Sequence, residues 1–414
     1  MGGLARRGGS MQDRFGRELL DRFRASPAVA ESWYSAQRFA IGYRRSVSDP
    51  ASWAYLGNLY AECACLAGAR RAERLSWYVA TMTEPATMPA DWATAAPLLR
   101  PVLAGSAFGR PVLGAAADGR AELVRRAALP MLDELVVVDL PSTIGYVTAE
   151  LVADWQVPVS QVFATARANL AADVRRTHNG PVSTREPRML RFVDDGEAYW
   201  VSRLLTEGWL AGLSELVGGR PVAFAPDRDC LVVVRDGTQL PGIFEIAAAE
   251  YQEAVRPVSP MAYTVDNAGR IVPYHAPPGH PAHLAATRAE RLLAGTAYDA
   301  QAELLRDAWE PARAGRLTVA SYLVAEPEGQ SSVSVSTWLE DAATLLPVTD
   351  RVAMVSRDRR QSWLVRWEAL VAALEPQPVP GLVPSRYQVG RWPRGEQRRV
   401  MLAAATHRRD GADG

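Results

Sequence analysis

The chain has 414 residues, of which 48% are apolar and 22% are charged, so its composition excludes a disordered protein and predicts two or three folded domains. Its 46 cationic and 46 anionic side chains balance, so no global field draws it toward nucleic acid or an anionic membrane. All of the cations are arginine. Walker A loops, Schiff-base enzymes, Ser-Lys nucleophile pairs and protein kinases depend on a lysine ammonium, so their usual forms are excluded. Codon bias in a high-GC genome explains the missing lysine more simply than avoidance of lysine modification.

The cysteines and the first residues of the chain indicate the cellular compartment of the protein. Cys63, Cys65 and Cys230 are too few for a disulfide framework, and their odd number argues against an oxidising compartment. No apolar run reaches the 18 or so residues of a spanning helix, and MGGLARRGGSMQDRF lacks the hydrophobic region of a signal peptide. We therefore expect a cytoplasmic protein without a membrane span.

The N-terminal part is expected to consist of a disordered segment, residues 1–10, and a mainly helical module, residues 11–118. Phe15, Leu19 and Phe23 recur at helical spacing, which predicts an amphipathic helix over 11–25. Residues 36–44 alternate like a strand. Further helices are expected over 48–66, 69–82 and 92–99, and another over 121–128, just beyond this module.

An α+β core is expected over residues 119–275. Its strands are predicted at 132–140, 189–193, 222–225 and 230–234. Its helices are predicted at 148–156, with Thr148 as the N-terminal cap, and at 158–174, 199–218 and 242–255.

A Pro-rich linker, residues 276–284, is expected to separate this core from a C-terminal α+β module, residues 285–408, followed by a loose tail, 409–414. Strands are predicted at 316–325, 331–338 and 350–356, helices at 284–315 and 362–374, and extended chain at 376–393. In the strand 331–338, Ser332, Ser334 and Ser336 share one face, which we expect to be exposed. The predicted fold class is α+β, with mixed sheets packed with helices in two to three modules.

Asp139 ends an apolar run and allows two readings. It resembles the magnesium-binding acid of a Walker B strand, but the chain has no phosphate loop, and it lacks the second aspartate of a phosphatase-type strand end. We favour the structural alternative, in which the carboxylate shapes the turn before Pro141.

Two other clusters carry weak chemical signals. His275, His280 and His283 fall in a Pro/Gly loop without a nearby acid or cysteine, so they are weak candidates for a metal site. Asp227 and Asp229 fit a hairpin turn better than an acid pair. The chain contains no GxSxG or GxGxxG motif, so we expect no cofactor.

Several segments in order resemble the YtpQ-like bacterial proteins, a family catalogued as domain of unknown function 1444. They run from LGNLYAECA through LLRPVLAGSAF, ELVVVDLPSTIGYVTAELVADWQVPVSQVFATARANLA, YWVSRLLTEGWLAGL and GGRPVAFAPDRDCLVVV to RPVSPMAYTVDNAGRIVPY. The resemblance covers about residues 35–275. It implies an intracellular α+β protein with no established activity and no catalytic residues to transfer.

If a site exists, we expect it among the polar residues of these family-like segments. They are Asp139, Asn169, Ser202, Arg203, Asp227, Arg228, Asp229, Ser259 and Tyr263.

Two functions stay open at this point. The first is a non-catalytic binding or adaptor module with an unidentified protein partner and without nucleic acid. The second is a hydrolase or transferase for an anionic small molecule, with Arg203 or Arg228 holding the anion and an aspartate as base. The catalytic candidates under this alternative are Ser202, Arg203, Asp227, Arg228, Asp229 and Tyr263.

Overall fold

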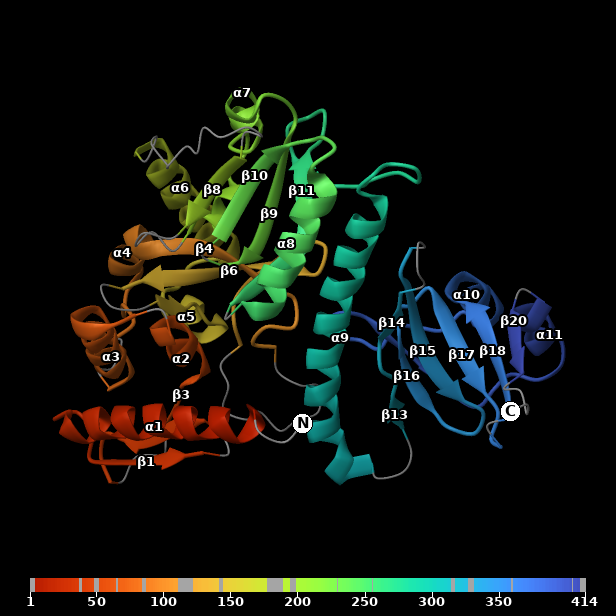
Figure 1. Cartoon of the computed structure of the whole chain (residues 1–414), viewed down its shortest axis with the longest axis horizontal. Helices are drawn as coiled ribbons and strands as arrows, with labels where there is room; N and C mark the ends of the chain where they lie inside the picture. Colours follow the sequence, from red (N-terminus) through yellow and green to blue (C-terminus); the bar gives the residue numbers. More distant parts are fainter. Residues whose placement is uncertain are drawn as a thin grey trace. The chain divides into compact units, whose positions relative to one another are not determined.

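Figure 1 presents the computed structural model of the protein. It describes residues 4–36, 39–47, 52–64, 66–83, 87–110, 122–140, 144–176, 189–193, 199–228, 230–254, 256–313, 317–326, 331–358, 360–403 and 405–409. Helices and mixed or antiparallel sheets alternate through this part of the chain, which confirms the predicted α+β class. The chain divides into two units, residues 1–99 with 137–145, and residues 100–136 with 146–414.

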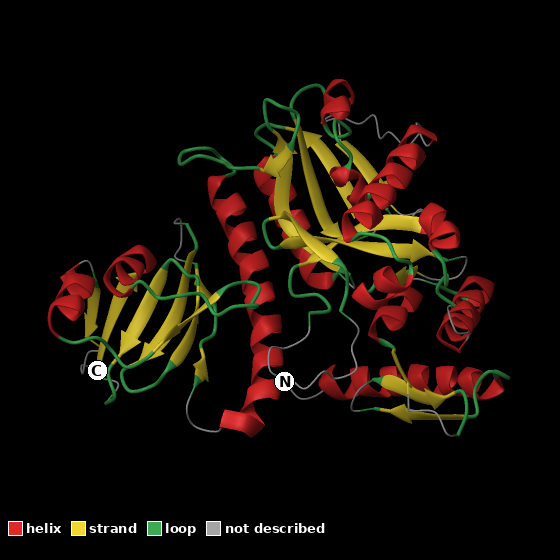
Figure 2. Ribbon diagram, turned by 180° about the vertical axis from the view of Figure 1, so that it is seen from behind, coloured by secondary structure: helices red, strands yellow, loops and turns green. Residues whose placement is uncertain are grey.

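In the first unit, helix α1 lies along a three-stranded antiparallel sheet of order β1-β2-β3 (Figures 1 and 2). Phe15, Leu19 and Phe23 of α1 are at most 5% exposed, which confirms the predicted apolar stripe. They pack with Ile41 of the sheet and Leu75 of α3. The elements are α1 (Leu4–Ala25), β1 (Glu31–Ser35), β2 (Ala40–Arg44), β3 (Ser52–Tyr55), α2 (Gly57–Ala64), α3 (Gly68–Thr83), α4 (Trp92–Ala95) and the 3-10 helix η1 (Ala96–Leu98).

A four-stranded sheet of order β4-β6-β5, with β7 on β6, carries two buried acids at the start of β6. Glu134 is fully buried, and its carboxylate accepts hydrogen bonds from Arg126 and from Arg167. The neighbouring Asp133 accepts from Arg110. The elements here are β4 (Leu99–Gly105), β5 (Arg125–Leu129), β6 (Leu132–Asp139), β7 (Ile144–Tyr146), α5 (Ala149–Asp154) and α6 (Val159–Arg176).

Two apolar clusters of the second unit lie on the two faces of an antiparallel sheet of order β12-β11-β9-β10-β8. Because side chains alternate along a strand, Val222 and Phe224 of β9 face helix α8, whereas Ala223 and Ala225 face Trp200 on the other side. The elements are β8 (Met189–Val193), η2 (Val201–Leu205), η3 (Ala211–Leu213), α7 (Ser214–Val217), β9 (Pro221–Asp227), β10 (Cys230–Arg235), α8 (Leu240–Glu253), β11 (Pro257–Val265) and β12 (Ile271–Pro273).

The long helix α9 (His283–Arg313) joins this sheet to the C-terminal sheets within the second unit. Ala289 and Leu293 pack on the five-stranded sheet, while Leu305 packs with Leu345 of the C-terminal part. The Pro-rich segment 276–284 forms the connection into α9, with Ala276 and Ala282 buried.

The C-terminal part contains a mixed sheet of order β14-β15-β17-β18-β20 and a smaller one of order β13-β16-β19. Trp338 and Met354 are almost completely buried between strands and helices, together with Leu370 of α10 and Met401 of α11. The elements are β13 (Thr318–Val319), β14 (Leu323–Ala325), β15 (Val333–Leu339), β16 (Thr344–Pro347), β17 (Arg351–Val355), β18 (Gln361–Arg366), α10 (Trp367–Leu374), β19 (Arg386–Val389), α11 (Gly395–Ala403) and β20 (Thr406–Arg409).

Arg386 on β19 is fully buried and joins the smaller sheet to α9. Its Nε donates to Oε1 of Gln301 at 2.6 Å and its Nη2 donates to the carbonyl oxygen of Tyr298 at 3.0 Å. Its Nη1 donates to the carbonyl oxygens of Ala320 and Leu345. Burial lowers the pKa of the guanidinium. All four acceptors are neutral oxygens, and each of the three guanidinium nitrogens donates to at least one of them.

Four predicted helices are wrong in part or in full. Residues 52–55 form β3 rather than helix, because they pair with β2, and 125–129 form β5, which pairs with β6. Residues 361–366 form β18 between two strands. The predicted helix 199–218 is broken into η2, η3 and α7, with Gly208 at a φ of 73°. In each case strand pairing or a left-handed glycine outweighs local helix preference.

Two further predictions differ from the structure. Helix α1 begins at Leu4, inside the segment expected to be disordered. The serine face of the predicted strand 331–338 is buried, not exposed: Ser332, just before β15, and Ser334 and Ser336 within it are at most 7% exposed. The Ser334 hydroxyl donates to Asp350 Oδ2 and accepts from the Asp350 amide, so its polar groups are satisfied inside the fold. The predicted boundary at residue 118 and the tail after 409 lie outside the described residues.

Candidate functional site

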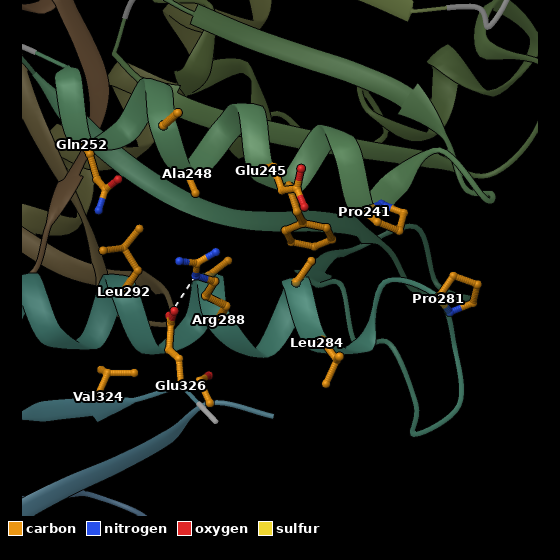
Figure 3. Close-up of a pocket in the computed structure, with 15 residues that line it drawn as sticks. Pro241, Glu245, Ala248, Gln252, Pro281, Leu284, Arg288, Leu292, Val324 and Glu326 are labelled. Atoms are coloured by element: carbon orange, nitrogen blue, oxygen red, sulfur yellow. Dashed lines mark hydrogen bonds and ion pairs between the residues drawn. The ribbon is translucent and has the colours of Figure 1, made fainter. Parts of the chain in front are cut away.

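Helices α8 and α9 form two walls of a groove with a volume of about 590 Å³. The labelled residues in Figure 3 show that the helices run in the same direction, with Pro241 and Pro281 at one end and Gln252 and Leu292 at the other. Val324 of β14 lies on the far side of α9 in this view. The residues that line the groove are Pro241, Phe244, Glu245, Ala248, Ala249, Gln252, Pro281, Leu284, Ala285, Arg288, Ala289, Leu292, Val324, Glu326 and Ser332.

The two helices contribute residues at helical spacing. On α8 the lining positions are 241, 244, 245, 248, 249 and 252, and on α9 they are 284, 285, 288, 289 and 292. These intervals of three and four place each set on one face of its helix. Small side chains such as Ala248 and Ala285 belong to these rows, which leaves room between the walls.

The groove combines an apolar floor with exposed apolar side chains. Phe244 is only 2% exposed and packs into the core beneath α8, whereas Leu284 is 44% and Val324 is 39% exposed. Val324 belongs to β14, the strand at one end of its sheet, and neighbouring Leu323 is 56% exposed. Exposed apolar residues along a groove are typical of surfaces that bind another molecule.

Polar groups of the groove are few and distinct. Arg288 Nε donates to Glu326 Oε1 at 2.8 Å, drawn as the dashed line in Figure 3. Glu245 is an exposed acid on α8 without a hydrogen bond or ion pair to the described part of the chain. The Ser332 hydroxyl is buried and has no hydrogen-bond partner. The charged groups thus comprise one ion pair and one additional carboxylate.

Ser202 and Arg203 lie in η2 and are structural in their surroundings. They are 3% and 4% exposed. The guanidinium carbon of Arg203 lies 3.7 Å from the ring centre of Trp200, a cation–π contact inside the core. Neither residue lines the groove.

Asp227 and Arg228 lie where β9 turns into β10, as the predicted hairpin requires. Asp227 Oδ2 accepts from the Arg256 amide at 3.3 Å, and Arg228 Nη1 lies 3.5 Å from the Tyr146 hydroxyl. Asp229 lies outside the described residues.

Tyr263 and Ser259 are both fully buried in β11, and their hydroxyls are 2.7 Å apart. Burial raises the pKa of the Tyr263 hydroxyl well above its usual range. Asn169 lies on α6, and Asp139 is the last residue of β6, while residues 141–143 of the expected turn lie outside the described residues. The contacts given above place Ser202 and Arg203 in η2 beside Trp200, Asp227 and Arg228 at the hairpin between β9 and β10, and Tyr263 within β11.

Of the three histidines in the Pro/Gly segment, His280 contacts the backbone, and His283 contacts the backbone and Ser331. In the described part of the chain, no group of three or more His, Cys, Asp or Glu side chains could hold a metal ion. His280 Nδ1 accepts from the Ala282 amide at 3.1 Å. His283 Nδ1 contacts the carbonyl oxygen of Ala276 at 2.8 Å, and its Nε2 lies 3.3 Å from the Ser331 hydroxyl.

Sequence reasoning missed the groove and the pairing of Ser331 with His283. The groove residues of α8 follow an amphipathic pattern that a buried helix face also produces. Ser331 is 48 positions from His283, so no local motif joins them.

Comparisons of the chain with models of known families, with curated proteins and with solved structures find no match. The resemblance to YtpQ-like proteins therefore stays a prediction. In the part of the chain that the structure describes, no helix combines the length and apolar character needed to cross a membrane.

Proposed function

We propose that this protein is a non-catalytic adaptor of the bacterial cytoplasm that holds a segment of a partner protein in the groove between α8 and α9. The observation that carries the proposal is the partial exposure of Leu284 and Val324 beside an apolar floor. Such side chains lose contact with water only when another molecule covers them, and their burial would supply the driving force for binding.

The charge of the chain supports a protein partner. Cations and anions balance at 46 each, and the groove carries Glu245 and Glu326 against one arginine, Arg288. A nucleic-acid site would need a cluster of cations to neutralise phosphates.

Affinity purification of paired variants tests the proposal. Leu284→Glu and Val324→Glu place a charge on the groove at partly exposed positions, so they should leave the fold intact. Val400→Glu changes a similarly exposed valine on α11, 49% exposed and outside the groove lining. We expect the wild type and Val400→Glu to retain the same partner, and both groove variants to lose it. Equal retention by all four proteins would refute the proposal.

A hydrolase is the second candidate, because the Ser331 hydroxyl lies 3.3 Å from His283 Nε2, as a nucleophile and its base would, next to the groove residues Ser332 and Leu284. The carbonyl oxygen of Ala276 can only accept, so His283 Nδ1 donates to it, and the neutral ring presents Nε2 as an acceptor to Ser331. Ser331 Oγ would attack the carbonyl carbon of an ester and pass its proton to His283. The leaving alcohol would take that proton, and water would release the acyl group by the same route.

A fluorophosphonate probe separates this candidate from the adaptor. Covalent labelling of the wild type that disappears in Ser331→Ala and in His283→Gln would favour the hydrolase. A wild type that resists labelling, tested beside a known serine hydrolase, would remove this candidate.

A further inference from the structure

We infer that the groove binds an amphipathic α-helix of the partner protein, laid along α8 and α9, and that this helix carries a cation beside its apolar stripe. The inference rests on the proposed function and names the conformation and the charge of the bound segment.

The two walls of the groove present rows of residues with the same helical spacing. Lining residues on α8 and α9 recur at intervals of three and four along helices that run in the same direction. Ridges and grooves with this period are the surfaces into which a third helix packs. From position 241 to 252 the α8 wall extends roughly 16 Å at about 1.5 Å per residue, the length of three helical turns. The site is thus long enough for the apolar anchors of one amphipathic helix.

Both helices contribute alanine side chains to the lining. Ala248 and Ala249 on α8 and Ala285 and Ala289 on α9 all belong to the lining. Alanine in these rows lets the backbone of an incoming helix approach the walls, so larger apolar side chains of that helix can enter the space between them. Phe244 at the floor offers them a ring to pack on.

The groove lining carries a net negative charge. Arg288 is paired with Glu326, while Glu245 on the opposite wall has no partner in the described part of the chain. The lining therefore holds one more acid than base. An arginine or lysine of the incoming helix would compensate Glu245 at the polar edge of its apolar stripe.

The competing occupant is an extended strand added to the edge of β14. This strand has three residues, Leu323–Ala325, so its free edge offers few backbone hydrogen bonds to an added strand. Only Val324 of the three lines the groove, whereas α8 and α9 provide most of the lining. A helix therefore uses more of the surface than a strand would.

Photo-cross-linking measures the conformation of the occupant directly. A photoreactive benzoylphenylalanine replaces Pro241 or Ala248, which are lining positions seven residues apart on α8, on either side of Glu245. A photoreactive residue is needed because the chain lacks the lysine that amine-reactive reagents require. Ile246 is the matched control, since it is 57% exposed on the same helix but is not part of the lining. Each protein is irradiated in its host cell, and the linked partner residues are located by mass spectrometry.

The shift between the two linked positions separates the occupants. Seven residues along α8 span about 10.5 Å, so a helical partner shifts by about seven residues. An extended strand rises about 3.3 Å per residue and shifts by only about three. We expect links from both groove positions to one partner segment, a shift near seven, and a lysine or arginine between the two linked partner residues, where it would face Glu245.

The possible outcomes distinguish this inference from the proposed function. A single partner segment with a shift near three overturns the helix while leaving the adaptor function intact. Protein links from the groove positions no stronger than those from Ile246, or links to lipid, overturn both. Glu245→Arg tests the cation separately: we expect at least a fivefold loss of retained partner, and unchanged or greater retention overturns the predicted cation.

Discussion

Arg288 on α9 and Glu326 after β14 form an ion pair in the groove lining, with 2.8 Å between Nε and Oε1. Their side chains are 62% and 46% exposed, so the pair is largely solvated. Exposed pairs of this kind contribute little to stability. Under the proposed function, the charges of this pair act on the bound helix rather than on the fold.

Opposite effects on binding are expected from the two halves of this pair. Glu326→Gln leaves Arg288 uncompensated and should slow association with a cationic helix, whereas Arg288→Gln leaves an extra acid and should speed it. Both variants should change the free energy of unfolding by less than about 1 kcal/mol. Association rates of the cross-linked partner, measured at low and moderate salt, check this. Glu396→Gln removes a similarly exposed ion pair with Arg399 on α11 and should leave the rate unchanged. Slower association in both groove variants would contradict the charge argument.

Glu134 should contribute measurably to stability because it is buried between two arginines. In Glu134→Gln, one carboxylate oxygen becomes an amide that cannot accept from Arg126 or Arg167, so we expect a loss of about 1 to 3 kcal/mol. Both arginine side chains are about two-fifths exposed, so they can turn to water, which keeps the loss moderate. Urea unfolding measures it, with the exposed Glu207→Gln as control. An unchanged midpoint would show that the buried carboxylate is dispensable.

The planar fork of Arg386 should not be replaceable by lysine. Arg386→Lys keeps the positive charge, but an ammonium cannot reach all the oxygens that surround the guanidinium. At least two buried acceptors lose their partner, so we expect a loss of about 2 to 4 kcal/mol. Arg391→Lys, at an exposed position on the following turn, should have no effect. Thermal unfolding of both variants checks the difference, and equal stability would mean that charge alone suffices.

Acid should weaken the contact between α1 and α3. Arg71 donates from both of its terminal nitrogens to Glu18, and these bonds hold the pKa of the Glu18 carboxyl below its usual value. The unfolded state then takes up the proton first as the pH falls, so this stabilisation is full above the ordinary glutamate value of about 4.3 and is lost below it. Both side chains are about one-third exposed, so the contribution is at most about 1 kcal/mol.

Urea unfolding of the wild type and of Glu18→Gln between pH 7 and pH 3.5 checks this. The difference between the two proteins should be constant down to about pH 4.5 and should shrink below it. A difference that grows in acid would contradict the sign of the shift.

Local pattern predicted the elements whose own residues determine them. Phe15, Leu19 and Phe23 form a stripe on α1, and Thr148 caps α5 with its side chain, because helical spacing and capping act within a few residues. The apolar run that ends at Asp139 forms β6, because a short continuous apolar run is typical of a strand that is buried on both faces. The fold class and the hairpin at Asp227 also follow from such short-range signals.

Tertiary structure alone decided which local preferences prevail and where a groove forms. Residues 125–129 form a strand because β6 lies beside them, and Ser334 is buried because Asp350 satisfies its hydroxyl. The groove arises because α8 and α9 pack side by side with alanines between them, although Ala248 and Leu292 lie far apart in the chain. Amphipathic spacing predicts that one face of a helix packs against other parts of the chain. The packing of distant segments determines which part of that face stays exposed to solvent.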